Sequence, residues 1–285
     1  MRSSSIRERW AVALAIGWGL VASGTSFGQD VPECLYAVTA QGDRLYRVSV
    51  DVEGSELVGE IGPIAPDASV NRLTIAGQDL AYTIDTQNEV LHAIRLSDAR
   101  VVTSTTLDQP LWVSSRALAV APDGVLWGVL GGAQLRTIDP DTGVTTHVGA
   151  IGGATYIEGM SFAPDGTLYA VSNIGSRFSR KLFIIDTSTG EATLLHELAV
   201  DDIDCLAWGY DGFLYGADAN GREADLIRIN PVTGMVSVPG NTGIVGVDGM
   251  AAAASCGCRA DFDRDGKLTI FDFFAFQDAF DAGCP

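Results

Sequence analysis

Oxygen-bearing side chains recur at a fixed spacing in residues 261–272, close to the C-terminus. Three aspartates stand two residues apart, Gly266 follows at the sixth position, and a fourth aspartate ends the run at the twelfth. A twelve-residue loop of this pattern offers Ca²⁺ the hard oxygen ligands that it prefers, and its glycine allows the sharp turn. The alternative is an acidic turn that only mimics the pattern. The predicted ligands are Asp261, Asp263, Asp265, Lys267 through its main-chain carbonyl, Thr269 and Asp272.

The residues around this loop extend the pattern. Position twelve is Asp272 rather than the glutamate that is usual in an EF-hand, and the segment from Cys258 to Pro285 resembles the dockerin-like module that ends some bacterial surface proteins. The resemblance implies a small α-helical, EF-hand-like tail that binds calcium and docks to a cohesin-like or surface-anchoring protein. Dockerins usually carry two such repeats, and this chain has one. Five phenylalanines follow the loop, and so small a module cannot bury them all, so some face the rest of the chain or a partner.

A second polar set is defined by its place in a repeat. Each member stands two residues before a leucine or methionine that occupies an equivalent position, so the set shares one location in the folded repeat. Carboxylates placed together in this way could hold a metal, and with Asn and Arg the set could bind a polar ligand. The members are Asn71, Arg116, Glu158, Asp204 and Asp248.

The repeat that positions this set is visible by self-comparison. Residues 121–127 (APDGVLW) recur as 163–169 (APDGTLY) and as 209–215 (GYDGFLY), with weaker copies earlier in the chain. Each copy ends in an aromatic residue, and these residues are 42 to 46 positions apart. A period near 45 with short alternating strands is typical of β-propeller blades. The aromatic residues are Tyr36, Tyr82, Trp127, Tyr169 and Tyr215.

One repeat shows the strands within a blade. Strands are expected at 159–163, 167–172, 181–186 and 191–196, with the turn at 187–190 ending in a glycine whose φ is positive. The first repeat lacks its inner strand, whereas residues 249–252 match an inner strand with no second strand after it. The sequence therefore predicts an all-β fold, a five-bladed β-propeller whose C-terminal strand completes the first blade and hides its edge.

The repeats resemble the NHL, YVTN and virginiamycin-lyase-like propeller repeats of secreted bacterial proteins over roughly residues 34–254. The resemblance implies the blade fold and no particular activity. Because inner strands line the central channel of a propeller, the five polar residues are expected to ring one of its mouths. The alternative is ordinary channel polarity, with Arg116 neutralising one or two of the acids.

The N-terminus predicts export. Residues 1–28 combine a basic start, an apolar stretch and small residues before a cleavage point, as in a signal peptide. The expected organisation is a signal peptide at 1–28, a propeller at 29–255 and the calcium-binding tail at 256–285. The mature chain is expected to have no transmembrane segment, to be secreted or held at the cell surface, and to be monomeric.

Charge excludes one class of partner. The chain has 18 Lys and Arg residues and 36 Asp and Glu residues. Residues 1–28 contain three arginines and one glutamate, so the mature chain has 15 basic and 35 acidic residues and a net charge of −20. Such a chain repels phosphate backbones, and nucleic acid is not an expected partner.

The five cysteines suit an oxidising compartment. Cys258 and Cys284 flank the calcium loop and are predicted to clip its ends. Cys34 and Cys256 fall at neighbouring places in the first blade, where a disulfide would lock the ring. Cys205 aligns with an inner strand and is predicted to be a buried free thiol.

No catalytic motif stands out. The three histidines, His92, His147 and His196, fall on outer strands or turns of different blades and cannot converge. The sequence therefore favours a non-catalytic binding or display propeller, exported and anchored through its calcium-binding tail. The alternative is a secreted hydrolase or lyase that acts on carbohydrate or lactone through the polar residues at the channel mouth.

Overall fold

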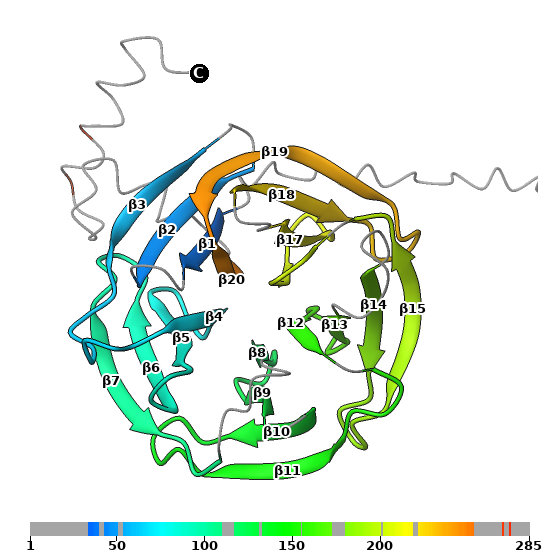
Figure 1. Ribbon diagram of the computed structural model, residues 1–285, viewed down its shortest axis with the longest axis horizontal. Helices are drawn as coiled ribbons and strands as arrows, with labels where there is room; N and C mark the ends of the chain where they lie inside the picture. The colour runs from blue at the N-terminus through cyan, green and yellow to red at the C-terminus, as the bar shows by residue number, and fades with distance from the viewer. Residues whose placement is uncertain are drawn as a thin grey trace, which may run out of the picture. The chain divides into compact units, whose positions relative to one another are not determined.

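The computed structural model describes residues 34–39, 43–50, 54–109, 117–130, 133–154, 156–172, 180–200, 202–218, 222–253, 270 and 274. These residues form five antiparallel four-stranded sheets, arranged as blades around a central axis (Figure 1). The predicted all-β, five-bladed propeller is confirmed.

The blades follow one another along the chain, each running from its inner to its outer strand. Blade 2 contains β4 (Val70–Ile75), β5 (Leu80–Asp85), β6 (Val90–Arg95) and β7 (Val101–Thr106). Blade 3 contains β8 (Ala117–Val120), β9 (Leu126–Leu130), β10 (Gln134–Ile138) and β11 (Thr145–Ala150). Blade 4 contains β12 (Ile157–Phe162), β13 (Leu168–Ser172), β14 (Arg180–Ile185) and β15 (Ala192–Leu198), within two residues of the predicted strands. Blade 5 contains β16 (Ala207–Trp208), β17 (Leu214–Asp218), β18 (Glu223–Ile229) and β19 (Val236–Val245).

The first blade joins the two ends of the propeller. Its order is β20 (Val247–Ala253), β1 (Cys34–Thr39), β2 (Arg44–Ser49) and β3 (Ser55–Glu60). β20 pairs antiparallel with β1, with Tyr36 opposite Ala251 and Val38 opposite Gly249. The predicted closure by a C-terminal strand is therefore confirmed, and β1 is paired on both sides.

The core consists of five apolar clusters, one between each pair of neighbouring blades. Between blades 2 and 3, for example, Ile84 and Leu91 pack with Leu118 and Leu126. The same arrangement recurs at the other four interfaces. Both faces of each blade must therefore be apolar, which explains why β1 is buried along its whole length.

The turn between the third and fourth strands also joins neighbouring blades. In blade 3 the Asp139 carboxylate accepts hydrogen bonds from the amides of Asp141 and Thr142, at 2.9 and 3.2 Å, and Gly143 ends the turn with a φ of 73°. A β-carbon on Gly143 would lie 2.0 Å from the Thr106 carbonyl oxygen of blade 2. Glycine is thus required by the backbone conformation and by the contact. Gly190 and Gly234 occupy the same place with positive φ, as predicted.

Of the predicted tail, the structure describes two residues. Ile270 and Phe274 are helical, and both are exposed. The six predicted calcium ligands, Cys256, Cys258, Cys284 and the signal peptide all lie outside the described residues, so those expectations remain predictions. Within the described part of the chain, no helix is long and apolar enough to cross a membrane.

Candidate functional site at the channel mouth

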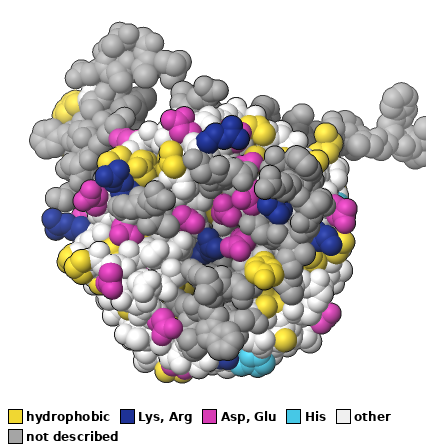
Figure 2. All heavy atoms as spheres, viewed as in Figure 1, with side chains coloured by type: hydrophobic (Ala, Val, Ile, Leu, Met, Phe, Trp, Pro, Cys, Tyr) yellow, Lys and Arg dark blue, Asp and Glu magenta, His cyan; other side chains and the backbone are white. Residues whose placement is uncertain are grey.

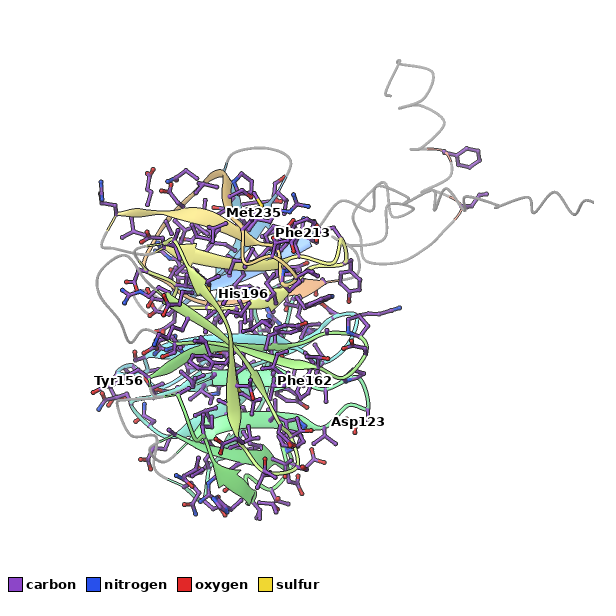
Figure 3. The ribbon with its side chains drawn as sticks, turned by 90° about the vertical axis from the view of Figure 1, so that its right-hand side faces the viewer. Asp123, Tyr156, Phe162, His196, Phe213 and Met235 are labelled. Carbon is purple, nitrogen blue, oxygen red and sulfur yellow. The ribbon has the colours of Figure 1, made fainter. Side chains whose placement is uncertain are left out.

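The two ends of the channel are defined by different loops. Figure 3 shows Asp123, in the turn between β8 and β9, on one side of the ring and Tyr156, just before β12, on the other. Glu158 follows Tyr156, and Asp204 and Asp248 lie at the equivalent places of blades 5 and 1. The predicted polar set therefore belongs to the mouth on the side of Tyr156.

An arginine that the sequence analysis did not single out lies at the centre of this mouth. In β4 the pairing with β5 shifts between Asn71 and Thr74, and Arg72 has a φ of 61°. The Thr83 hydroxyl supports this unusual backbone by donating to the Arg72 carbonyl at 2.6 Å and to the Asn71 carbonyl at 3.1 Å. Left-handed backbone is unfavourable for a residue with a β-carbon, so these bonds and those of the guanidinium must offset its cost.

The Arg72 guanidinium connects four blades. Its Nη1 donates to the main-chain oxygens of Asp248 and Asp204, at 2.6 and 3.2 Å, and its Nη2 forms an ion pair with the Glu158 carboxylate. Only 8% of Arg72 is exposed. A single buried cation thus joins blade 2 to blades 1, 4 and 5 through charge-assisted hydrogen bonds.

Carboxylates outnumber cations around Arg72. Burial is the main cause that raises the pKa of Asp204 to about 7, and the charges of Asp202, Glu158 and Asp248 raise it further while Arg72 lowers it. Asp202 is paired with Arg180 at 3.0 Å. In the face shown in Figure 2, basic and acidic side chains lie next to one another near the centre. Asp204 therefore changes charge near neutral pH.

The predicted set is partly brought together. Glu158 contacts Arg72 through its carboxylate, whereas Asp204 and Asp248 contact it through their main-chain oxygens. The Asn71 amide instead donates within blade 2, to Ser69 and to the Thr86 hydroxyl at 2.9 Å. Arg116 lies outside the described residues. The repeat alignment predicts Asn71 at the mouth because it assumes an inner strand of unbroken register. The register shift in β4 places Arg72 there instead, so Arg72 makes the contacts that were expected of Asn71.

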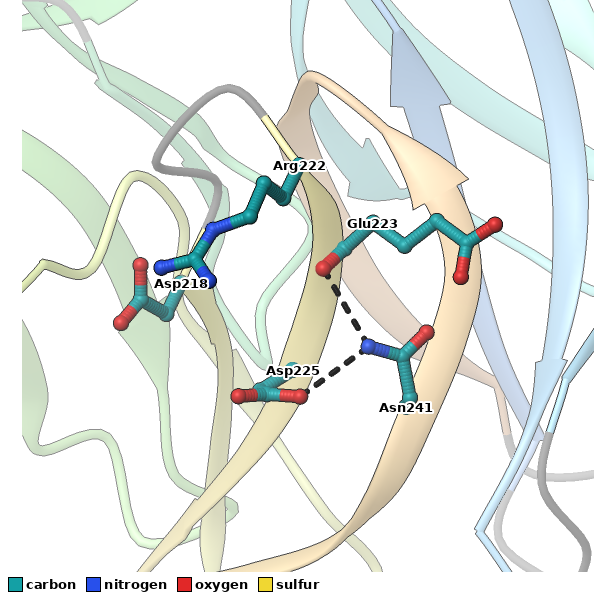
Figure 4. A pocket seen from close by; sticks show the side chains of 5 residues that line it. All are labelled: Asp218, Arg222, Glu223, Asp225 and Asn241. Atoms are coloured by element: carbon teal, nitrogen blue, oxygen red, sulfur yellow. Dashed lines mark hydrogen bonds between the residues drawn. The ribbon is translucent and has the colours of Figure 1, made fainter.

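A pocket lies in blade 5 (Figure 4), and its lining residue Asp218 follows Ala217, whose carbonyl accepts a hydrogen bond from the Asp204 amide. It has a volume of about 460 Å³. The Asn241 side-chain amide donates to the Glu223 carbonyl at 3.2 Å and to the Asp225 carboxylate at 3.0 Å. Both hydrogen bonds of its nitrogen are therefore made to other residues that line the pocket. Three acids and one arginine leave the wall with a formal charge of −2. Its lining residues are Asp218, Arg222, Glu223, Asp225 and Asn241.

The histidines are separated, as predicted. His92 is on β6, His147 on β11 and His196 on β15, in three different blades. Their ring nitrogens contact Ser104, Gln134 and the Pro231 carbonyl, at 2.9, 2.8 and 3.0 Å. Burial lowers the pKa of His92. Across the described ranges, no three His, Cys, Asp or Glu side chains come together in a way that could hold a metal ion.

The described cysteines lie where the blade alignment placed them. Cys205 is a buried free thiol just before β16, which confirms its prediction, and burial raises its pKa. Cys34 is buried at the start of β1, opposite Ala253 at the end of β20. Ala253 precedes Cys256 by three residues, so the Cys34–Cys256 disulfide remains a prediction that suits the position of Cys34.

Fold and repeats together define the chain as a repeat-built, five-bladed β-propeller with a polar channel mouth. It belongs to the family described as "Repeat of unknown function (DUF6923)", which matches residues 30–176. No curated protein matches the sequence.

The chain is also similar to solved structures. A chain of a nidogen/laminin complex is 13% identical with a TM-score of 0.52, over 79% of this chain and 99% of that one. TolB from Acinetobacter baumannii is 14% identical with a TM-score of 0.49, over 78% of this chain and 66% of its own. Virginiamycin B lyase from Staphylococcus aureus is 14% identical with a TM-score of 0.46, over 71% of this chain and 67% of its own. At 13% identity the likeness to the nidogen/laminin chain concerns the fold alone.

Proposed function

We propose that the protein is an exported, non-catalytic binding propeller, displayed at the cell surface through its calcium-binding tail. The observation that carries the proposal is the bonding at the channel mouth. Arg72 is buried and bound to Glu158 and to two main-chain oxygens, so these groups hold blades together. A catalytic constellation needs groups that are free to meet a substrate. The mouth is instead suited to a structural role, in which Arg72 joins four blades at one face of the propeller.

A combined binding and turnover assay tests this proposal. The full-length protein would be incubated with soluble oligosaccharides and with short-chain lactones, and both its melting temperature and product formation would be measured. We expect one compound class to raise the melting temperature without product formation, because a ligand that binds only the folded state stabilises it. Turnover that falls when Glu158 is changed to Gln would contradict a non-catalytic role, and turnover that is unaffected would point to a contaminant.

One observation favours the second candidate, a hydrolase or lyase acting on carbohydrate or lactone. The pKa of Asp204 is about 7, near the value at which a carboxyl group is most useful as a general acid or base at neutral pH. If this candidate holds, Asp204→Asn abolishes product formation while ligand-induced stabilisation persists. In the non-catalytic case, neither variant nor wild type forms product.

The tail gives a calcium prediction. Four aspartates close together in residues 261–272 repel one another until a cation neutralises them. Adding EDTA to the full-length protein is therefore expected to lower hydrogen-exchange protection within residues 258–285 and to leave the blades unchanged. The matched control is Asp263→Asn with Asp265→Asn, which should be insensitive to EDTA. Loss of protection in the blades would show that structural metal lies elsewhere.

The anchoring partner is part of the same proposal. A cohesin-like or surface-anchoring protein that recognises the tail should bind the full chain in calcium and release it in EDTA. Binding that survives both EDTA and the double substitution would assign anchoring to another surface.

A further inference from the structure

We propose that the channel mouth is a pH-responsive clasp, in which a proton on Asp204 keeps four blades drawn together and its loss loosens them. This device does not depend on what the propeller binds. It rests on where Asp204 lies, which charges surround it, and which strands Arg72 joins.

Both main-chain polar groups of Asp204 form hydrogen bonds. Its amide donates to the Ala217 carbonyl in β17 at 3.2 Å, and its carbonyl accepts from Arg72 at 3.2 Å. Cys205, the next residue, is buried. The main chain of Asp204 therefore cannot move away from the mouth without breaking its hydrogen bonds to β17 and to Arg72.

Charged groups from each neighbouring element act on this carboxyl. Among the described residues, β4 contributes Arg72, β12 contributes Glu158, β20 contributes Asp248, and the segment of Asp204 itself contributes Asp202. Arg180 on β14 is paired with Asp202. When Asp204 is protonated, the cluster contains three carboxylates and two arginines. When Asp204 is ionised, it contains four carboxylates and the same two arginines. The added charge repels groups on β12 and β20, the strands that Arg72 holds close.

The sign of the effect follows from linkage. In the unfolded chain an aspartate ionises near pH 4, whereas Asp204 in the folded chain keeps its proton up to about pH 7. Folding thus takes up a proton between these values, so stability falls as the pH rises across that window and does not change further above it.

The test compares wild type with Asp204→Asn, because asparagine resembles the protonated acid in shape and cannot ionise. The variant should have the higher melting temperature at both pH 5 and pH 8, and its advantage should be larger by roughly 5 to 10 °C at pH 8 than at pH 5. Hydrogen exchange at pH 8 should be at least about tenfold faster in wild type than in Asp204→Asn at residues 157–160 and 247–250, because each unit of the shift in the Asp204 pKa corresponds to a factor of ten.

Asp67→Asn is the matched control, because Asp67 is exposed and outside this cluster. It should follow the wild type at both pH values. The carboxyl ¹³C signal of Asp204 provides a direct measurement and should titrate near pH 7. Titration near pH 4, or a melting difference that is the same at pH 5 and pH 8, would overturn the clasp.

Discussion

Replacing Arg72 with methionine is expected to lower the free energy of unfolding by about 3 kcal/mol, because removing one partner of a buried ion pair leaves the other charge uncompensated. Methionine retains the β-carbon and most of the length of the side chain, so the unusual backbone at this position is equally unfavourable in both proteins. The substitution leaves the Glu158 carboxylate without its ion pair and removes the donor to the Asp248 and Asp204 carbonyls. Urea unfolding followed by tryptophan fluorescence measures the loss.

Arg100→Met is the matched control. Arg100 forms an exposed ion pair with Asp98 at 3.7 Å, so its removal should cost no more than about 0.5 kcal/mol. Adding Glu158→Gln to Arg72→Met should restore part of the stability, because the uncompensated charge is removed. A loss below about 1 kcal/mol for Arg72→Met would mean that water replaces the guanidinium at little cost, and that Arg72 does not join the blades.

The sequence was sufficient to predict the blades because each repeat encodes them locally. The turn that ends at Gly143 carries both its Asp139 cap and its glycine. The same arrangement recurs in blade 4 with Asp186 and in blade 5 with Asn230. The closing strand was predictable because residues 249–252 matched an inner strand that had no successor. Local turn chemistry and one orphan strand therefore determine the number of blades.

The mouth was only partly predictable, for a physical reason. A repeat alignment assumes that each inner strand keeps the same register, and one extra residue moves the next side chain to the other face. The shift in β4 does this, so Arg72 rather than Asn71 reaches the Glu158 carboxylate and the main-chain oxygens of Asp204 and Asp248. Neither the positive φ of Arg72 nor its contacts in three other blades has a local sequence signal. The pocket in blade 5 escaped prediction similarly, because Asn241 and Asp218 meet there from different strands.

Gly249→Ala is the second substitution with a large expected effect. A β-carbon on Gly249 would lie 2.6 Å from Cα and C of Arg72 and 2.6 Å from N of Leu73. These are main-chain atoms of the neighbouring blade, so no side chain can rotate to make room, and β20 or β4 must move. We expect a loss of about 3 kcal/mol in the free energy of unfolding, at the upper end of the usual cost of overpacking.

Gly77→Ala is the control for Gly249→Ala, because an added β-carbon at Gly77 has no heavy atom within 4 Å. It should change the stability by less than about 0.5 kcal/mol, or raise it slightly by restricting the unfolded chain.

Because Gly249 contacts the backbone of Arg72, the two large effects should not add: combining Gly249→Ala with Arg72→Met should cost less than the sum of the single changes. Full additivity would mean that the closing strand and the Arg72 joint stabilise the ring independently, whereas a small effect of Gly249→Ala alone would mean that the inner strands can separate without weakening the propeller.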